Sequence, residues 1–174
     1  MKKTVVLVGP MGSGKSSVGR ELSRALNLPF VDLDEELVSR HGPIPALFAA
    51  RGEAAFRELE SAALAAVLAG PAVVLATGGG AVLAEANRAA LAEHTVIRLT
   101  ISPETAARRL AGDATRPLLA GDHPEEAWAR IARERAPHYQ AVASHTVAAD
   151  ADGPQTVART VLTAMRTEPE EHSS

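Results

Sequence analysis

The feature that most constrains the fold is a short apolar run that leads directly into a glycine-rich loop. Residues 4–8 read Thr-Val-Val-Leu-Val, a composition that suits a strand buried on both faces. Residues 9–16 follow as Gly-Pro-Met-Gly-Ser-Gly-Lys-Ser, and residues 15–27 then place apolar side chains along one stripe of a helix. A strand, a G-x-x-x-x-G-K-S loop and a helix in this order indicate a phosphate-binding unit of a parallel α/β sheet.

The loop contains the groups needed to hold a nucleoside triphosphate. Gly12, Ser13 and Gly14 allow successive backbone N–H groups to point into one concavity, at the positive end of the following helix. Lys15 offers a charge to the β and γ phosphates, and the hydroxyl of Ser16 is a ligand for Mg²⁺. Because the motif matches at every fixed position, an accidental glycine turn is a poor alternative.

The rest of the chain alternates apolar runs with helical periods, as in a parallel sheet with crossover helices. We expect further strands at residues 30–32, 73–75, 95–99 and 145–148. We expect helices at residues 35–40, 44–68 and 154–165, with breaks near residues 42–43 and at Gly52. A further helix should start at residues 102–104, with Ser102 as its cap and a proline in its first turn. The predicted fold is a single doubly wound α/β domain of the P-loop NTPase type, with a five-stranded parallel sheet, helices on both faces and a mobile lid.

Composition narrows the function classes. A net charge of -3 and a pI near 6.1 give no electrostatic case for binding nucleic acid or an anionic membrane. No apolar stretch approaches the roughly 20 residues of a membrane helix. The chain has no cysteine, which excludes disulfides and thiolate sites and is consistent with a reducing compartment. We therefore expect a cytoplasmic, monomeric protein with small-molecule partners, without nucleic-acid or membrane partners.

An acidic pair, Asp32 and Asp34, stands where the second predicted strand ends. Ligands of open α/β sheets lie beyond the carboxyl ends of the strands, which is the edge that carries the loop. One carboxylate could hold Mg²⁺ through water, because no predicted strand ends in an ordinary Walker B acid. The other could orient or deprotonate an acceptor hydroxyl. The alternative is that Asp34 caps the helix that follows.

Two arginines lie in predicted helices, and one of them, Arg57, could grip a substrate carboxylate. Arg57 has Glu53 and Glu60 near its face of the helix, either as a surface salt-bridge cluster or as acids that orient its guanidinium. Arg135 is either solvated or functional. Residues 78–80 are three glycines, which permit close approach of a ligand or form a plain turn.

The segment at residues 111–124 has no helical or strand period. Long irregular segments inside compact domains are usually functional, and lids are the common case. Arg116 lies within this segment. A cation on a mobile cover above the loop would stabilise the charge of a phosphoryl group in transfer.

Together these elements resemble the shikimate kinase family, from residue 4 to about residue 165. They occur in the family's order: the loop, Asp32-x-Asp34, Phe56-Arg57-x-x-Glu60, Gly78-Gly79-Gly80, Arg116-Pro117-Leu118-Leu119 and Arg135-x-x-x-Tyr139. The resemblance implies transfer of the γ-phosphoryl group of ATP to the 3-hydroxyl of shikimate, with one Mg²⁺ ion. We therefore expect a P-loop kinase domain at residues 1–167 with a lid at about 111–124, and the polar residues 168–174 predict a disordered tail.

The resemblance also implies roles for individual residues. Lys15, Asp34 and Arg116 would be catalytic, and Asp32 would reach the metal through water beside Ser16. The acceptor would contact Asp34, Arg57, Glu60, Gly79, Gly80 and Arg135, with Phe48 and Phe56 as an apolar wall. ATP would contact Gly12, Ser13, Gly14, Lys15, Ser16, Ser17, Arg109 and Arg116, with Arg109 near the adenine.

One loop departs from the family's pattern, and two other functions remain as alternatives. Residues 150–154 read Asp-Ala-Asp-Gly-Pro, without the basic residue that the family's adenine loop often carries. A related small-molecule kinase, such as one for gluconate, is the nearer rival. A nucleotide-dependent switch or binding module is the other, although it would not need a walled acceptor pocket.

Overall fold

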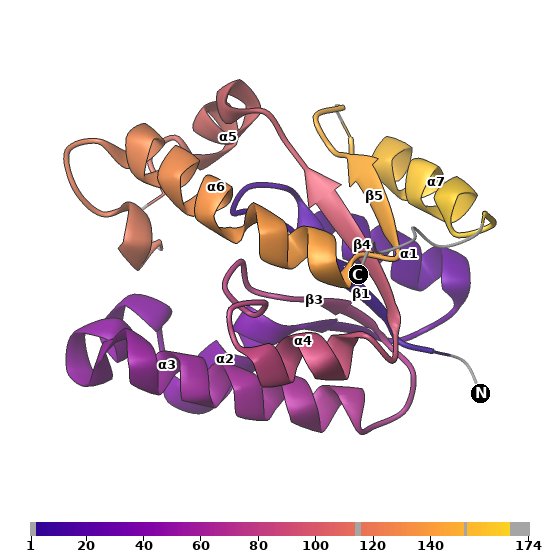
Figure 1. Cartoon of the computed structure of the whole chain (residues 1–174), viewed down its shortest axis with the longest axis horizontal. Helices are drawn as coiled ribbons and strands as arrows, with labels where there is room; N and C mark the ends of the chain where they lie inside the picture. Colours follow the sequence, from indigo (N-terminus) through magenta and orange to yellow (C-terminus); the bar gives the residue numbers. More distant parts are fainter. Residues whose placement is uncertain (1–2, 114–115, 152, 168–174) are drawn as a thin grey trace.

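The computed structural model describes residues 3–113, 116–151 and 153–167. Within these residues, five parallel strands form one sheet in the order β2-β3-β1-β4-β5 (Figure 1). The strands are β1 (Val5–Val8), β2 (Phe30–Asp32), β3 (Val74–Ala76), β4 (Thr95–Thr100) and β5 (His145–Ala148). The predicted five-stranded parallel α/β fold is confirmed, and the mobility of the lid stays a prediction.

Helices cover both faces of the sheet (Figure 1). They are α1 (Lys15–Leu26), α2 (Leu33–His41), α3 (Ile44–Leu68), α4 (Glu85–Leu91), α5 (Pro103–Leu110), α6 (Pro124–Val142) and α7 (Pro154–Ala164), with a 3₁₀ turn η1 (Pro117–Leu119). Helices α1 and α7 pack on one face, and α3, α4 and α6 pack on the other. No helix among the described residues is long and apolar enough to cross a membrane.

The central strand β1 divides the core into two layers. Val5 and Leu7 join the cluster on the side of α1 and α7, whereas Val6 and Val8 join the cluster on the side of α3 and α6. All four side chains are buried. Alternation along a strand sends successive side chains to opposite faces, so a strand covered on both faces needs an uninterrupted apolar run.

Local signals account for two helix boundaries. Gly52 breaks the geometry of α3 with φ 80° and ψ 172°, as the sequence predicts. Helix α2 begins at Leu33, before the predicted start, because the Asp32 carboxylate accepts hydrogen bonds from the backbone N–H of Asp34 at 3.0 Å and of Glu35 at 3.1 Å. The interpretation of Asp34 as the cap is therefore wrong, since Asp32 is the cap.

Other differences concern segments with weak signals. Helix α4 was not predicted, because its seven residues are too few to show a clear helical period. The predicted lid contains η1, and α6 begins at its last residue, Pro124. Residues 114–115 of that lid, Asp152 of the predicted adenine loop and the predicted tail at 168–174 lie outside the described residues.

Candidate active site

The glycine-rich loop joins β1 to α1 at the carboxyl end of the sheet. Gly14 precedes α1 in the left-handed region, with φ 86°, a conformation that favours glycine. The Lys15 ammonium donates hydrogen bonds to the carbonyl oxygens of Gly9 at 2.8 Å and Pro10 at 3.0 Å. Lys15 thus folds back over the loop, where a bound phosphate would lie.

The environment of Lys15 weakens its basicity. Removal of the ammonium from water lowers its pKa from 10.5 to about 8, and the positive charge of Arg116 acts in the same direction. The carboxylates of Asp34 and Asp32 oppose this change. Two cations and two carboxylates are thus within electrostatic reach of one another beside the loop, and added phosphate charge would be balanced by Lys15 and Arg116.

Ser16 and Asp32 meet at the start of α1. The Ser16 hydroxyl donates to Oδ2 of Asp32, whose other oxygen, Oδ1, caps α2. A hydroxyl and a carboxylate oxygen in contact are the hard oxygen donors that Mg²⁺ prefers. These two residues fit the predicted metal site.

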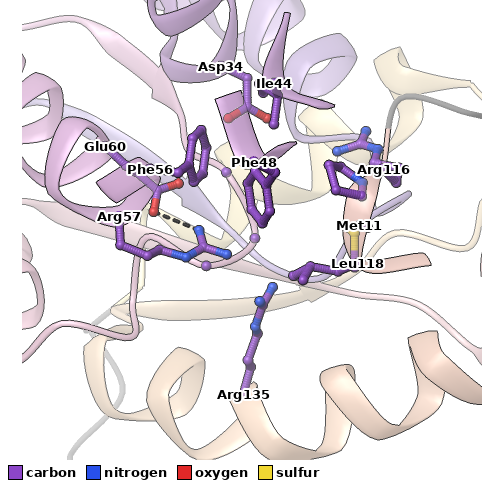
Figure 2. Close-up of a pocket in the computed structure, with 14 residues that line it drawn as sticks. Met11, Asp34, Ile44, Phe48, Phe56, Arg57, Glu60, Arg116, Leu118 and Arg135 are labelled. Carbon is purple, nitrogen blue, oxygen red and sulfur yellow. Dashed lines mark hydrogen bonds and ion pairs between the residues drawn. The ribbon is translucent and has the colours of Figure 1, made fainter. Parts of the chain in front are cut away.

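A pocket opens beside the loop, and most of the residues predicted to bind the acceptor line it (Figure 2). Asp34 comes from α2, Arg57 from α3 and Arg135 from α6, and the three side chains point into the same space. The pocket is also lined by Phe48, Phe56, Glu60, Gly79, Gly80 and Arg116. Elements distant in the sequence thus bring three guanidinium groups and two carboxylates together.

Arg57 is oriented by a buried acid. Its Nη1 donates to Oε1 of Glu60 at 2.8 Å, and Glu60 is only 1% exposed. A surface salt-bridge cluster is therefore the wrong interpretation of this pair, although the more distant contact with Glu53, at 3.5 Å, lies near the surface. Burial raises the pKa of Glu60, and the charge of Arg57 opposes the increase. Oε2 of Glu60 is buried and has no hydrogen-bond partner among the described residues.

Arg135 is buried at 6% exposure, so the solvated alternative is also wrong. The Tyr139 hydroxyl, one helical turn further along α6, donates a hydrogen bond to the carbonyl of Gly79 and accepts one from Arg135. A Cβ at position 79 would lie 3.3 Å from Nη1 of Arg135, and one at position 80 would lie 2.2 Å from Nη1 of Arg57. The glycines admit both guanidinium groups, so they are more than a plain turn.

Asp34 and Glu60 approach the same point above Gly78. A Cβ there would lie 2.9 Å from Oδ1 of Asp34 and 2.8 Å from Oε2 of Glu60. Burial raises the pKa of Asp34, as does the charge of Asp32, whereas Lys15, Arg116 and Arg57 oppose the increase. A carboxylate with a raised pKa is a better proton acceptor.

Apolar residues close the pocket. The rings of Phe48 and Phe56 pack at 4.9 Å between centroids, and the guanidinium of Arg57 lies 5.2 Å from the ring of Phe56. Four further residues line the pocket without a role predicted from the sequence, namely Met11, Ile44, Pro117 and Leu118. No local sequence signal marks Met11 or Ile44 as a pocket residue. Pro117 and Leu118, in contrast, belong to the Arg-Pro-Leu-Leu element that contributes to the family resemblance.

Arg116 reaches the pocket from the segment before η1. Its Nε lies 3.5 Å from Oδ2 of Asp113 in an ion pair, and its charge acts on Lys15 and Asp34. Arg116 therefore lines the acceptor pocket within electrostatic reach of Lys15 in the loop.

A separate pocket lies on the other side of the loop, between α1, α5 and the residues after β5. Arg109 bridges it, since Nη1 donates to the carbonyl of Gly12 at 3.0 Å and Nη2 to that of Ala149 at 2.8 Å. Ser13, Gly14 and Ser17 also line this pocket, and the rest of its wall is Val18, Ala149, Ala151, Gly153, Pro154 and Val157. Small and apolar walls beside a guanidinium suit a stacked nucleotide base.

A parallel sheet with this loop, and with two pockets that flank it, defines a P-loop kinase fold. The shikimate kinase family profile matches residues 11–166, and the chain belongs to that family. A shikimate kinase of Chromohalobacter salexigens is 45% identical over 161 residues, covering 91% of this chain and 89% of its own length. A shikimate kinase of Salinispora tropica is 46% identical over 159 residues, covering 91% and 95%.

Solved structures agree with this assignment. Shikimate kinase from Acinetobacter baumannii in complex with shikimate has a TM-score of 0.92 and 34% identity, covering 95% of this chain and 94% of that chain. A gluconokinase from Sinorhizobium meliloti 1021 has a TM-score of 0.65 at 19% identity, which shows a shared fold alone. The comparisons favour the shikimate kinase family over the gluconate rival.

Proposed function

We propose that the chain transfers the γ-phosphoryl group of ATP to the 3-hydroxyl of shikimate, giving shikimate 3-phosphate and ADP. The observation that carries this proposal is the convergence of Arg57, Arg135 and Asp34 in one pocket beside the phosphate-binding loop (Figure 2). Two guanidinium groups suit a carboxylate, and an opposing carboxylate suits hydroxyl groups. The acceptor is thus an anionic alcohol, which fits the family.

Acceptor binding follows from the charges in the pocket. Arg57, oriented by Glu60, and Arg135, beside Tyr139, would grip the carboxylate of shikimate from α3 and α6. Gly79 and Gly80 would allow the ring close to the backbone, with Phe48 and Phe56 along its apolar side. The hydroxyl groups would then face Asp34.

Phosphoryl transfer requires a proton acceptor and charge stabilisation. The 3-hydroxyl oxygen forms a bond to the γ-phosphorus, its proton passes to the Asp34 carboxylate, and the bond from phosphorus to the β–γ bridging oxygen breaks to release ADP. Lys15 and Arg116 stabilise the negative charge on the transferred group. Raised basicity at Asp34 and the two facing cations support these roles.

The nucleotide occupies the loop and the pocket that Arg109 bridges. Backbone N–H groups of residues 12–16 bind the phosphates, and the base lies beside Arg109, with Ser17 near the sugar and phosphates. Ser16 would hold Mg²⁺ directly and Asp32 through water. When bound, the ion supplies neutralising charge at the phosphate oxygens.

The same proposal includes a single kinase domain at residues 1–167, with residues 111–124 as a lid that carries Arg116. We also infer that the protein acts as a cytoplasmic monomer. Among the described residues, the exposed large apolar side chains are Val38 and Leu83, which form no extended patch that would require a partner.

Acceptor-dependent ADP release tests the proposal. Purified protein with ATP and Mg²⁺ is assayed with shikimate, with gluconate and with no acceptor, and the product is identified by mass spectrometry. We expect strong stimulation by shikimate, with shikimate 3-phosphate formed in a one-to-one ratio with ADP. Preference for gluconate would support the related kinase, and equal ADP release with and without shikimate would support the nucleotide-dependent switch.

A further inference from the structure

The carbonyl groups on the outer side of the phosphate-binding loop are held by side chains from other helices. Arg109, in the last turn of α5, donates to the carbonyl of Gly12 at 3.0 Å. Trp128, near the start of α6, donates from its indole Nε1 to the carbonyl of the preceding residue, Met11, at 2.9 Å. Consecutive peptides of the loop are thus bonded to two different helices.

The bond from Trp128 is enclosed. Trp128 is 6% exposed and Met11 is 7% exposed, and both belong to a buried cluster with Ala106 of α5 and Leu119 of η1. A carbonyl in such a place needs a protein donor, because water cannot easily replace a lost one. The indole therefore supplies both apolar contact area and the hydrogen bond that fixes this peptide.

The cluster also connects the loop to Arg116. Helices α5 and α6 border the segment that carries Arg116, and Leu119 follows Arg116 closely in the chain. The Met11 side chain lines the acceptor pocket, as Arg116 does. Because C=O and N–H of a trans peptide point in opposite directions, holding the carbonyl of Met11 also sets the direction of the N–H of Gly12.

We propose that Trp128 is a positioning residue for phosphoryl transfer. Its N–H holds the Met11 peptide of the loop, and its ring packs with Leu119, so that the loop and Arg116 keep the relative placement that the reaction needs. Small displacements of such groups lower the rate of the chemical step more than they weaken substrate binding. This inference rests on the proposed function, since it concerns the same reaction.

The chain has a single tryptophan, which permits a sharp test. Replacing it in the protein by β-(3-benzothienyl)alanine keeps the shape of the ring system and removes only the N–H donor. Trp128→Phe serves as a genetic counterpart that also reduces packing. Val142→Ala is the matched control, because Val142 is a buried residue of α6 that packs in the cluster on the sheet and away from the loop.

We expect kcat to fall about tenfold in the benzothienyl protein and in Trp128→Phe, with KM for shikimate within about twofold of that of the unaltered protein. The melting temperature of the benzothienyl protein should change little, and Val142→Ala should lose stability while keeping its kcat. A benzothienyl protein with unchanged kcat would overturn the proposal. A kcat loss in Val142→Ala equal to that of Trp128→Phe would also overturn it, because packing of α6 would then suffice as an explanation.

The unaltered protein, assayed alongside, separates this inference from the proposed function. If that protein does not phosphorylate shikimate, the proposed function fails. If it does, and the protein without the indole N–H does so equally well, the role of Trp128 alone is rejected.

Discussion

The phosphate-binding loop and the acceptor pocket are neighbours built by different means. The loop is one contiguous segment, organised by the backbone conformation of its glycines and by hydrogen bonds from Lys15 to its own carbonyls, with Arg109 and Trp128 holding two further carbonyls from outside. The acceptor pocket takes its charged groups from α2, α3 and α6, and each is placed by tertiary packing. The comparison indicates that single changes in the acceptor pocket should impair acceptor binding or turnover and leave nucleotide binding intact.

The largest effect should come from Asp34→Asn. The amide keeps the shape of the side chain but cannot accept the proton, so kcat should fall by at least about 100-fold. KM for ATP should stay within about twofold, because Asp34 lies in the acceptor pocket. Steady-state ADP release measures both values. A kcat close to that of the unaltered protein would remove Asp34 from the chemistry.

The second-largest effect should come from replacing either of the arginines that we propose bind the carboxylate. Arg57→Ala and Arg135→Ala should each raise KM for shikimate about ten- to a hundredfold, because a charge-assisted hydrogen bond contributes roughly 1.5–3 kcal/mol. Arg40→Ala is the control, since Arg40 is an exposed arginine of α2 paired with Glu36 and outside the pocket. If either variant weakens ATP binding instead of shikimate binding, that arginine serves the phosphate-binding loop and not the acceptor pocket.

A smaller effect is expected from Gly80→Ala. The added methyl group would lie 2.2 Å from Nη1 of Arg57, so the guanidinium must move away from its place. KM for shikimate should rise about tenfold, with little change for ATP. Gly70→Ala is the matched control, because a Cβ there comes no closer than 3.4 Å to a neighbouring atom. Equal behaviour of the two variants would show that Arg57 tolerates displacement.

The smallest effect concerns the pH dependence of stability. Burial raises the pKa of Glu60 above its ordinary value of 4.5, so the folded protein holds a proton that the unfolded chain releases. The free energy of unfolding should therefore decrease as pH rises from about 4.5 through the folded-state pKa of Glu60.

In Glu60→Gln, the part of this decrease that comes from Glu60 should be absent, because the amide does not titrate. Asp34 contributes a decrease of the same sign and should keep its share in the variant. Urea denaturation at several pH values compares the two proteins. Parallel stability curves would show that the pKa of Glu60 is not raised in the folded protein.

The sequence predicted the framework well because the relevant signals are local. Buried strands appear as apolar runs, Gly52 breaks α3 through its own backbone geometry, and Ser102 caps α5 by accepting from the N–H of Thr105. The short helix α4 has too few residues to show a period. Local signals therefore reveal elements in proportion to their length and capping.

The sequence identifies most residues of the candidate site, but it does not show how they are arranged or how deeply they are buried. From the sequence alone, Arg57 could belong to a surface ion pair and Arg135 could be a solvated side chain. The burial of Glu60, the partner of Arg57, excludes the first interpretation, and the burial of Arg135 itself excludes the second. The roles of Asp32 and Asp34 also separate only in three dimensions, where Asp32 caps α2 and Asp34 lines the pocket. Exposure depends on neighbours that are distant in the chain, so no local pattern reports it.

By itself, the sequence determined a parallel α/β sheet and a loop that can bind phosphate, because strand burial, glycine conformation and helix capping act over a few adjacent residues. Tertiary structure alone decided which charges face one another. It placed the guanidinium groups of α3 and α6 over the glycines after β3, and it brought the indole of Trp128 to the outer side of the loop. Such contacts join residues far apart in the chain, and the packing of the helices on the sheet decides them.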